Sequence, residues 1–271
     1  MTDAAAPEVL YDVADHIATI TFNRPERQNT ISGPMLNAFT ERLVEANGAD
    51  EVRAVVITGS GRFFCAGLDL RGGGIASGLS EDGDSEPPAP VTNLDLRDTP
   101  PTVLHGVDKP TICALNGSAA GYGLDLALGC DIRIMSDAAK LSAAFTARGV
   151  LPESGGTWIL PRLLGWSKAA ELVFSGRTLG AEECLSLGLV SKVVPADEVA
   201  ESARSLAGEI AANAPLAVQA AKRMMRMGMN ENFNDHVHHV FLQLLPLFKS
   251  ADFREGMAAF LERRAPEFKG R

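Results

Sequence analysis

Short runs rich in β-branched residues recur in the first two-thirds of the chain and alternate with helical patterns. The runs are IATITF at 17–22, AVVITG at 54–59, TICAL at 111–115 and DIRIM at 131–135. A helical pattern, PMLNAFTERLVEAN, follows the first run at 34–47. Alternation of this kind is typical of βα units built around a largely buried sheet. We therefore expect an α/β fold.

Two segments depart from the alternation. The segment between 72 and 109 contains GGGIASGLSEDGDSEPPAP, which is too polar to pack as a core element, so we expect a mobile loop over a site. After residue 196 the pattern becomes almost purely helical, with breaks at Pro or Gly. The sequence thus predicts a core at 1–195 and a C-terminal helical subdomain at 196–271.

Composition excludes several classes of protein. The chain has 271 residues, 46% of them hydrophobic, which is enough for a sizeable core. Its net charge is −9 and it has no dense Lys/Arg run, so we predict no nucleic-acid partner. No run approaches the ~18 apolar residues of a membrane span, and the N-terminus lacks a secretory pattern. We expect a cytoplasmic protein without a membrane partner, whose four cysteines, which form no C-x-x-C pair, are reduced.

No metal or cofactor is expected. The three histidines between 236 and 239 have neither the i, i+4 spacing of a metal-binding helix nor cysteines nearby. The glycine-containing segments match neither a dinucleotide fingerprint nor a P-loop.

Two glycine turns are the first candidates for chemistry. In GRFFCAGLDL, at 61–70, a strand passes through an Ala-Gly turn that can expose the backbone N–H of Leu68. In ALNGSAAGYGLDLALGCDIRI, at 114–134, a strand meets small residues before a helix whose first N–H groups include that of Tyr122. Two such donors directed at one oxygen would form an oxyanion hole.

At these turns the sequence resembles the crotonase superfamily, the enoyl-CoA hydratase/isomerase family. The resemblance extends over nearly the whole chain. It includes NRPERQNTIS, FFCAGLDL, the N-G-x-A-x-G-x-G-x-D-L-A-L-x-CDIRI stretch, GGTWILPRLLG and SADFREGMAAFLERR. It implies a spiral of ββα turns with a C-terminal helical trimerisation region, assembled as a homotrimer or homohexamer. It also implies an acyl-CoA substrate, whose thioester carbonyl would be held by the N–H groups of Leu68 and Tyr122.

The same resemblance suggests residues that bind the substrate. Ala66, Asp69 and Leu70 match the turn that contacts CoA in the family, and Arg27 lies where the family runs beside the CoA nucleotide. Phe260 and Arg263 fall where a neighbouring subunit commonly contacts the adenine end of CoA.

The acidic residues decide which reaction the family resemblance implies. Hydratases of the family place two glutamates around a water. In this chain the first position is Asp125 and the second is Phe145, which cannot hold water and would form a wall of the pocket. Several family isomerases instead carry their catalytic carboxylate just after the Pro of the next loop, where this chain has Glu153. Glu153 is therefore the predicted base, with Asp125 as its partner or as a second proton carrier. An apolar pocket should raise the pKa of the Glu153 carboxyl.

Other interpretations of these acids and of the function stay open. Glu153 could be an acid favoured by a helix N-terminus, and Asp125 could pair with a base such as Arg148. We expect an enoyl-CoA double-bond isomerase of the kind seen in Δ3,Δ2-enoyl-CoA or ring-epoxide isomerases. The first alternative is an enoyl-CoA hydratase with an altered carboxylate pair. The second is an acyl-CoA-binding paralogue without efficient catalysis.

Overall fold

The computed structural model describes residues 6–69 and 99–271. Within these ranges ten strands form two sheets. The strands are β1 (Val9–Ala14), β2 (Ile17–Phe22), β3 (Ala54–Gly59), β4 (Phe63–Cys65), β5 (Thr111–Leu115), β6 (Ser118–Ala120), β7 (Ile132–Ser136), β8 (Lys140–Ser142), β9 (Thr178–Gly180) and β10 (Lys192–Val194). The larger sheet has the order β1-β2-β3-β5-β7-β10, and the smaller has the order β4-β6-β8-β9. In the larger sheet only β1 and β2 pair antiparallel.

The four predicted strands are confirmed, because β2, β3 and β5 have the predicted bounds and β7 is shifted by one residue. Successive units each supply one strand to each sheet: β3 and β4, then β5 and β6, then β7 and β8. The predicted ββα spiral is therefore confirmed.

The larger sheet is buried on both faces, as its unbroken apolar runs require. Residues alternate along each strand, so Val55 and Ile57 join the main core while Ala54 and Val56 face a second, smaller core. The second core is closed by Ala203 and other small residues of α7.

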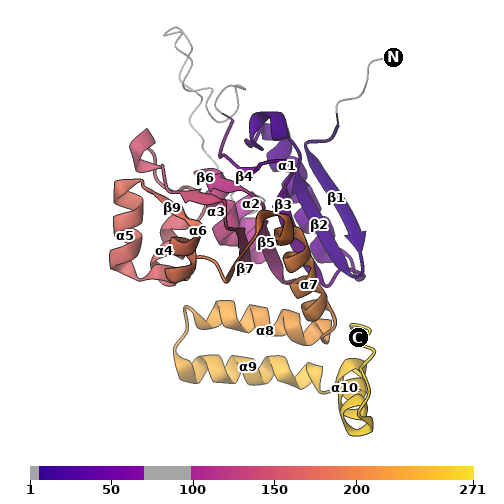
Figure 1. The fold of residues 1–271 in the computed structure, drawn as a ribbon. Coiled ribbons are helices and arrows are strands. Elements are labelled where there is room, and N and C mark those ends of the chain that lie inside the picture. The colour runs from indigo at the N-terminus through magenta and orange to yellow at the C-terminus, as the bar shows by residue number, and fades with distance from the viewer. Residues whose placement is uncertain (1–5, 70–98) are drawn as a thin grey trace, which may run out of the picture.

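Helices cover the sheets and extend the chain at its C-terminal end (Figure 1). Their bounds are α1 (Gly33–Gly48), α2 (Pro100–Gly106), α3 (Tyr122–Gly129), α4 (Gly156–Leu164), α5 (Trp166–Ser175), α6 (Ala181–Ser186), α7 (Val199–Ala211), α8 (Pro215–Gly228), α9 (Phe233–Leu247) and α10 (Ala251–Glu262). Figure 1 shows α8 and α9 side by side below the sheets, with α10 beyond them. No helix in the described ranges is long and apolar enough to cross a membrane.

The predicted loop at 72–109 lies in large part outside the described residues, and its described end contains α2, which buries Leu104 against the main core. Lys109 is buried as well and donates from Nζ to the Ala46 carbonyl at 2.7 Å.

The predicted division of the chain at 195/196 stays a prediction. Because α7 packs on the sheet, packing alone would place the change after Ala211.

Candidate functional site

In the part of the chain that the structure describes, the turn after β4 presents the Leu68 N–H without a hydrogen-bond partner. Gly67 has φ +105°, a conformation that glycine adopts without strain. The peptides on either side of Leu68 are bonded to Ile31: the Ile31 N–H donates to the Gly67 carbonyl at 2.8 Å, and the Asp69 N–H donates to the Ile31 carbonyl at 2.9 Å. Within the described ranges the Leu68 N–H makes no hydrogen bond, so it is available to a ligand.

The second turn, between β6 and α3, lies directly against the first. Gly121 has φ +52° and precedes Tyr122, the first residue of α3, whose N–H has no acceptor in the described part of the chain. A Cβ at Gly67 would lie 3.1 Å from the Ala120 carbonyl oxygen and 3.8 Å from the Tyr122 nitrogen. Two free N–H groups on touching turns, one of them at a helix N-terminus, can stabilise negative charge on one oxygen.

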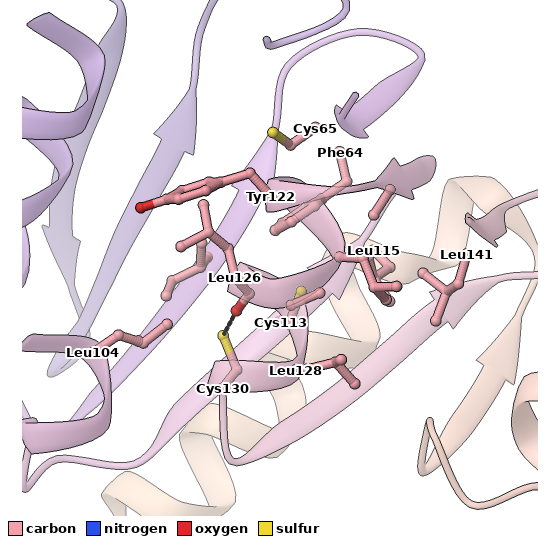
Figure 2. Packing of buried hydrophobic residues seen from close by; sticks show 14 of the residues in the cluster. Phe64, Cys65, Leu104, Cys113, Leu115, Tyr122, Leu126, Leu128, Cys130 and Leu141 are labelled. Atoms are coloured by element: carbon pink, nitrogen blue, oxygen red, sulfur yellow. Dashed lines mark hydrogen bonds between the residues drawn. The ribbon is translucent and has the colours of Figure 1, made fainter. Parts of the chain in front are cut away.

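Glycines allow this close contact between α3 and the neighbouring strand. A Cβ at Gly123 would lie 2.2 Å from the Cys65 carbonyl oxygen, so only glycine fits there. Figure 2 shows the packing around α3, with Cys65 near Tyr122, Leu104 on one side and Leu141 on the other. The helix that carries one donor is thus fixed against the strand that leads to the other.

A polar network supports the Leu68 turn from the N-terminal side. Arg24 donates from Nη2 to Asp69 Oδ2 at 3.0 Å, and its Nε lies 3.1 Å from Glu8 Oε1. Asn29, fully buried, donates to the carbonyls of Ser60 and Phe63. The Asp69 carboxylate therefore serves to hold the turn, and its contact with CoA stays a prediction.

The far end of α3 is held by a buried guanidinium. Arg133, only 7% exposed, donates to the Cys130 carbonyl from Nη1 and to the Leu189 carbonyl from Nε, both at 2.6 Å. Burial lowers the pKa of Arg133. A cation at a helix C-terminus is favoured by the helix dipole, so Arg133 anchors α3.

Asp125 lies in the first turn of α3 and is 1% exposed. Its Oδ2 accepts the Ser154 N–H at 2.9 Å, whereas Oδ1 is buried without a hydrogen bond of ordinary geometry in the described residues. Burial raises the pKa of Asp125 to about 7, the Glu153 charge adds to the rise, and the N–H groups of Ser154 and Gly156 oppose it. The possible pairing with Arg148 is not seen, since Arg148 donates to the Ala144 carbonyl.

Glu153 is adjacent in sequence to the residue that Asp125 binds. It lies in the turn before α4, and its side chain is exposed. The apolar enclosure predicted for Glu153 is therefore wrong for the single chain, because the buried acid of the site is Asp125. The structure brings the two predicted acids together, but in different environments.

The remaining predicted residues are distributed more widely. Phe145 is 2% exposed within the main core, so its role as a pocket wall stays a prediction. The Ala66 N–H donates to the Gln28 carbonyl, and Leu70 lies outside the described residues. Arg27 is exposed on the 3-10 helix Pro25–Arg27.

Phe260 and Arg263 lie far from the two turns of their own chain. Phe260 is 77% exposed on α10, and Arg263 follows the end of that helix. Figure 1 shows α10 at the end of the layer formed by α8 and α9, below the sheets and away from α3. Only a neighbouring copy could bring these side chains to a site, which is how the prediction placed them.

Sequence reasoning missed several supporting residues. Arg24 and Asn29 lie in the NRPERQNT stretch, and Gly156 lies in the Gly-Gly pair before Thr157. Both stretches carry the family resemblance, and that resemblance was the signal that could have pointed to these residues. Among the described residues no group of three His, Cys, Asp or Glu side chains could hold a metal ion. The expected absence of a cofactor stays a prediction.

Known proteins are similar to this chain in sequence and in fold. The family model described as Enoyl-CoA hydratase/isomerase matches residues 12–271. A probable enoyl-CoA hydratase of Rhodobacter capsulatus is 36% identical over 97% of this chain and 98% of its own length. The 1,2-epoxyphenylacetyl-CoA isomerase of Escherichia coli K12 is 35% identical over 97% of this chain and 98% of its own. The crystal structure of an enoyl-CoA hydratase from Bacillus anthracis has a TM-score of 0.85 and 32% identity, covering 97% of this chain and 100% of that one. The chain therefore belongs to the enoyl-CoA hydratase/isomerase family, the crotonase superfamily.

Proposed function

We propose that the protein is an acyl-CoA isomerase that moves the double bond of a 3-enoyl-CoA to the 2-position. The observation that carries the proposal is the contrast between the two acids. Glu153 is exposed on its turn, whereas Asp125 is sealed behind it. Where the family's hydratases carry their second glutamate, this chain has Phe145, which cannot orient water.

A single accessible carboxylate suits this reaction. The thioester oxygen accepts the N–H groups of Leu68 and Tyr122, and Glu153 removes a proton from the α-carbon. The electron pair of that C–H bond forms the dienolate, whose charge the two donors stabilise. Glu153 then returns the proton to the γ-carbon, and the new double bond lies between the α- and β-carbons. No water enters the balance of atoms.

The names of the relatives include both an isomerase and a hydratase. The E. coli relative is named a 1,2-epoxyphenylacetyl-CoA isomerase, which favours isomerisation. The R. capsulatus relative is named a probable hydratase, which favours the alternative that Asp125 and Glu153 together position water. A hydratase would need both carboxylates to reach one water, and the burial of Asp125 argues against that arrangement.

One experiment separates these functions. The protein is incubated with 3-enoyl-CoA and, separately, with 2-enoyl-CoA in water labelled with heavy oxygen, and double-bond position and oxygen uptake are followed independently. We expect double-bond movement without incorporation of label. Rapid incorporation without movement would establish the hydratase instead, and tight binding without either reaction would establish a non-catalytic paralogue.

A further inference from the structure

Asp125 joins the two halves of the candidate site. Its backbone belongs to α3, three residues after Tyr122, and its own N–H donates to the Gly121 carbonyl at 3.1 Å. Its carboxylate reaches the turn that carries Glu153, where Oδ2 accepts the N–H of Ser154. One residue therefore connects an oxyanion donor to the predicted base.

Helix α4 begins without a cap of its own. Its N-cap residue is Gly155, which has no side chain to accept a hydrogen bond, and no acid lies in its first turn. The first N–H groups of a helix need acceptors from elsewhere, and a carboxylate is favoured there by the helix dipole. Asp125 places a carboxyl group from α3 beside this helix start, where its Oδ2 accepts the N–H of Ser154, two residues before α4 begins.

Glycine at 156 permits the contact. A Cβ at this position would lie 2.3 Å from Asp125 Oδ1 and 2.8 Å from Pro152 Cβ. The carboxyl group therefore packs directly on the first residue of α4, and a side chain there would displace it.

We propose that Asp125 is a positioning residue that fixes the Glu153 turn relative to the Tyr122 N–H, and that the substrate proton does not pass through Asp125. The proposal rests on the function proposed above for Glu153. Burial at 1% exposure keeps the Asp125 carboxyl away from solvent, and its bond to Ser154 fixes the peptide that follows Glu153. The raised pKa of Asp125 agrees with a group sealed from water.

Two substitutions separate positioning from proton transfer. Asp125→Asn keeps an oxygen that can accept the Ser154 N–H but cannot carry a proton, whereas Asp125→Leu has similar volume and no acceptor. We expect Asp125→Leu to lower kcat on the order of 10²-fold through misplacement of Glu153, with KM little changed. We expect Asp125→Asn to recover most of that loss.

A second variant acts on the carboxyl group without removing it. Gly156→Ala should push the Asp125 carboxyl from its place and lower kcat in the same direction as Asp125→Leu. Gly208→Ala in α7 is the matched control, since a Cβ there meets no atom within 4 Å, and it should leave kcat unchanged.

Deuterium exchange of the Ser154 amide reads the contact independently of turnover. We expect faster exchange in Asp125→Leu and Gly156→Ala than in wild type and Asp125→Asn. Equal loss of kcat in Asp125→Asn and Asp125→Leu would overturn the proposal by making Asp125 a proton carrier. Wild-type kcat or an unchanged Ser154 exchange rate in Asp125→Leu would overturn it as well.

Glu153→Gln, run in parallel, reports on the proposed function alone. If this variant keeps wild-type turnover, Glu153 is not the base. The exchange rate of the Ser154 amide still decides whether Asp125 positions the turn.

Discussion

Among single residues, Glu153 carries the most specific expectation. Glu153→Gln keeps the size of the side chain but cannot accept the α-proton, so turnover of 3-enoyl-CoA should fall on the order of 10²-fold or more. Affinity for an unreactive acyl-CoA, measured by calorimetry, should change little, because the carboxylate acts on the reacting carbon and not on CoA. Glu182→Gln, an exposed acid at the start of α6, is the control and should behave as wild type. Retention of isomerisation by Glu153→Gln would remove it from the mechanism.

Asp125 gives an expectation about stability and pH. Its pKa in the folded chain is about 7, above the ordinary value of 3.8, so the folded state holds this proton more tightly than the unfolded chain does. The Asp125 contribution to the free energy of unfolding should therefore fall as pH rises from about 4 to about 7, and the loss should be complete above that range. The size of the loss is at most about 4 kcal/mol.

Asp125→Asn removes this titration, because an amide does not ionise in that range. We expect the free energy of unfolding of the variant, relative to wild type, to increase as pH rises from about 4 to about 7, as measured by urea denaturation. A difference that stays constant across that range would mean that Asp125 titrates alike in the folded and unfolded chains.

At the scale of residues, the sequence predicts which acids belong to the site better than it predicts how deeply each acid is buried. Glu153 and Asp125 were identified as the acids of interest, and the structure brings them to one place. The burial of Asp125 could not be predicted, because it depends on contact with the turn before α4. The hydrogen bond between Asp125 and that turn joins residues 29 positions apart. A contact of that kind depends on how α3 packs on α4, which no local pattern encodes.

At the scale of elements, the start of α3 allows the oxyanion proposal to be tested without loss of the helix. Tyr122 is the first helical residue, a position where proline is tolerated because its missing N–H has no intrahelical partner. Tyr122→Pro should lower kcat on the order of 10²-fold or more by removing one donor. Tyr122→Ala is the matched control, since it removes the same ring but keeps the N–H. The claim fails if the two variants, compared by steady-state kinetics and circular dichroism, fold and turn over equally.

Longer elements were predicted from the sequence more accurately than short ones. β2, β3 and β5 have five or six apolar or β-branched residues each, which is enough for a clear pattern. The smaller sheet consists of three-residue strands, such as β4 and β6, which are too short to show any periodicity. They form because the preceding long strands and the glycine turns bring them together.

At the scale of the whole molecule, the C-terminal helices leave a large apolar surface uncovered. α9 buries none of its residues in the single chain. The exposed apolar side chains of α8 to α10 are Met225, Met227, Phe233, Val237, Val240, Phe241, Leu242, Leu244, Leu245, Phe253, Met257, Phe260 and Leu261. Exposed apolar side chains that extend over three helices mark an interface with another protein.

We expect another copy of the chain to cover this surface, because self-association into a closed ring buries the apolar surface of every copy in the same way. Light scattering coupled to size-exclusion chromatography should show a trimer or hexamer. Phe241→Lys places a charge on α9 where the side chain is 55% exposed, and should shift the population toward smaller species. Leu10→Lys, on β1 at 41% exposure, is the control outside the helical region and should leave the assembly unchanged. Phe260 and Arg263 would reach a neighbour's CoA only within such an assembly, so dissociation by Phe241→Lys should also weaken acyl-CoA binding. A wild-type chain that stays monomeric at every concentration would contradict both expectations.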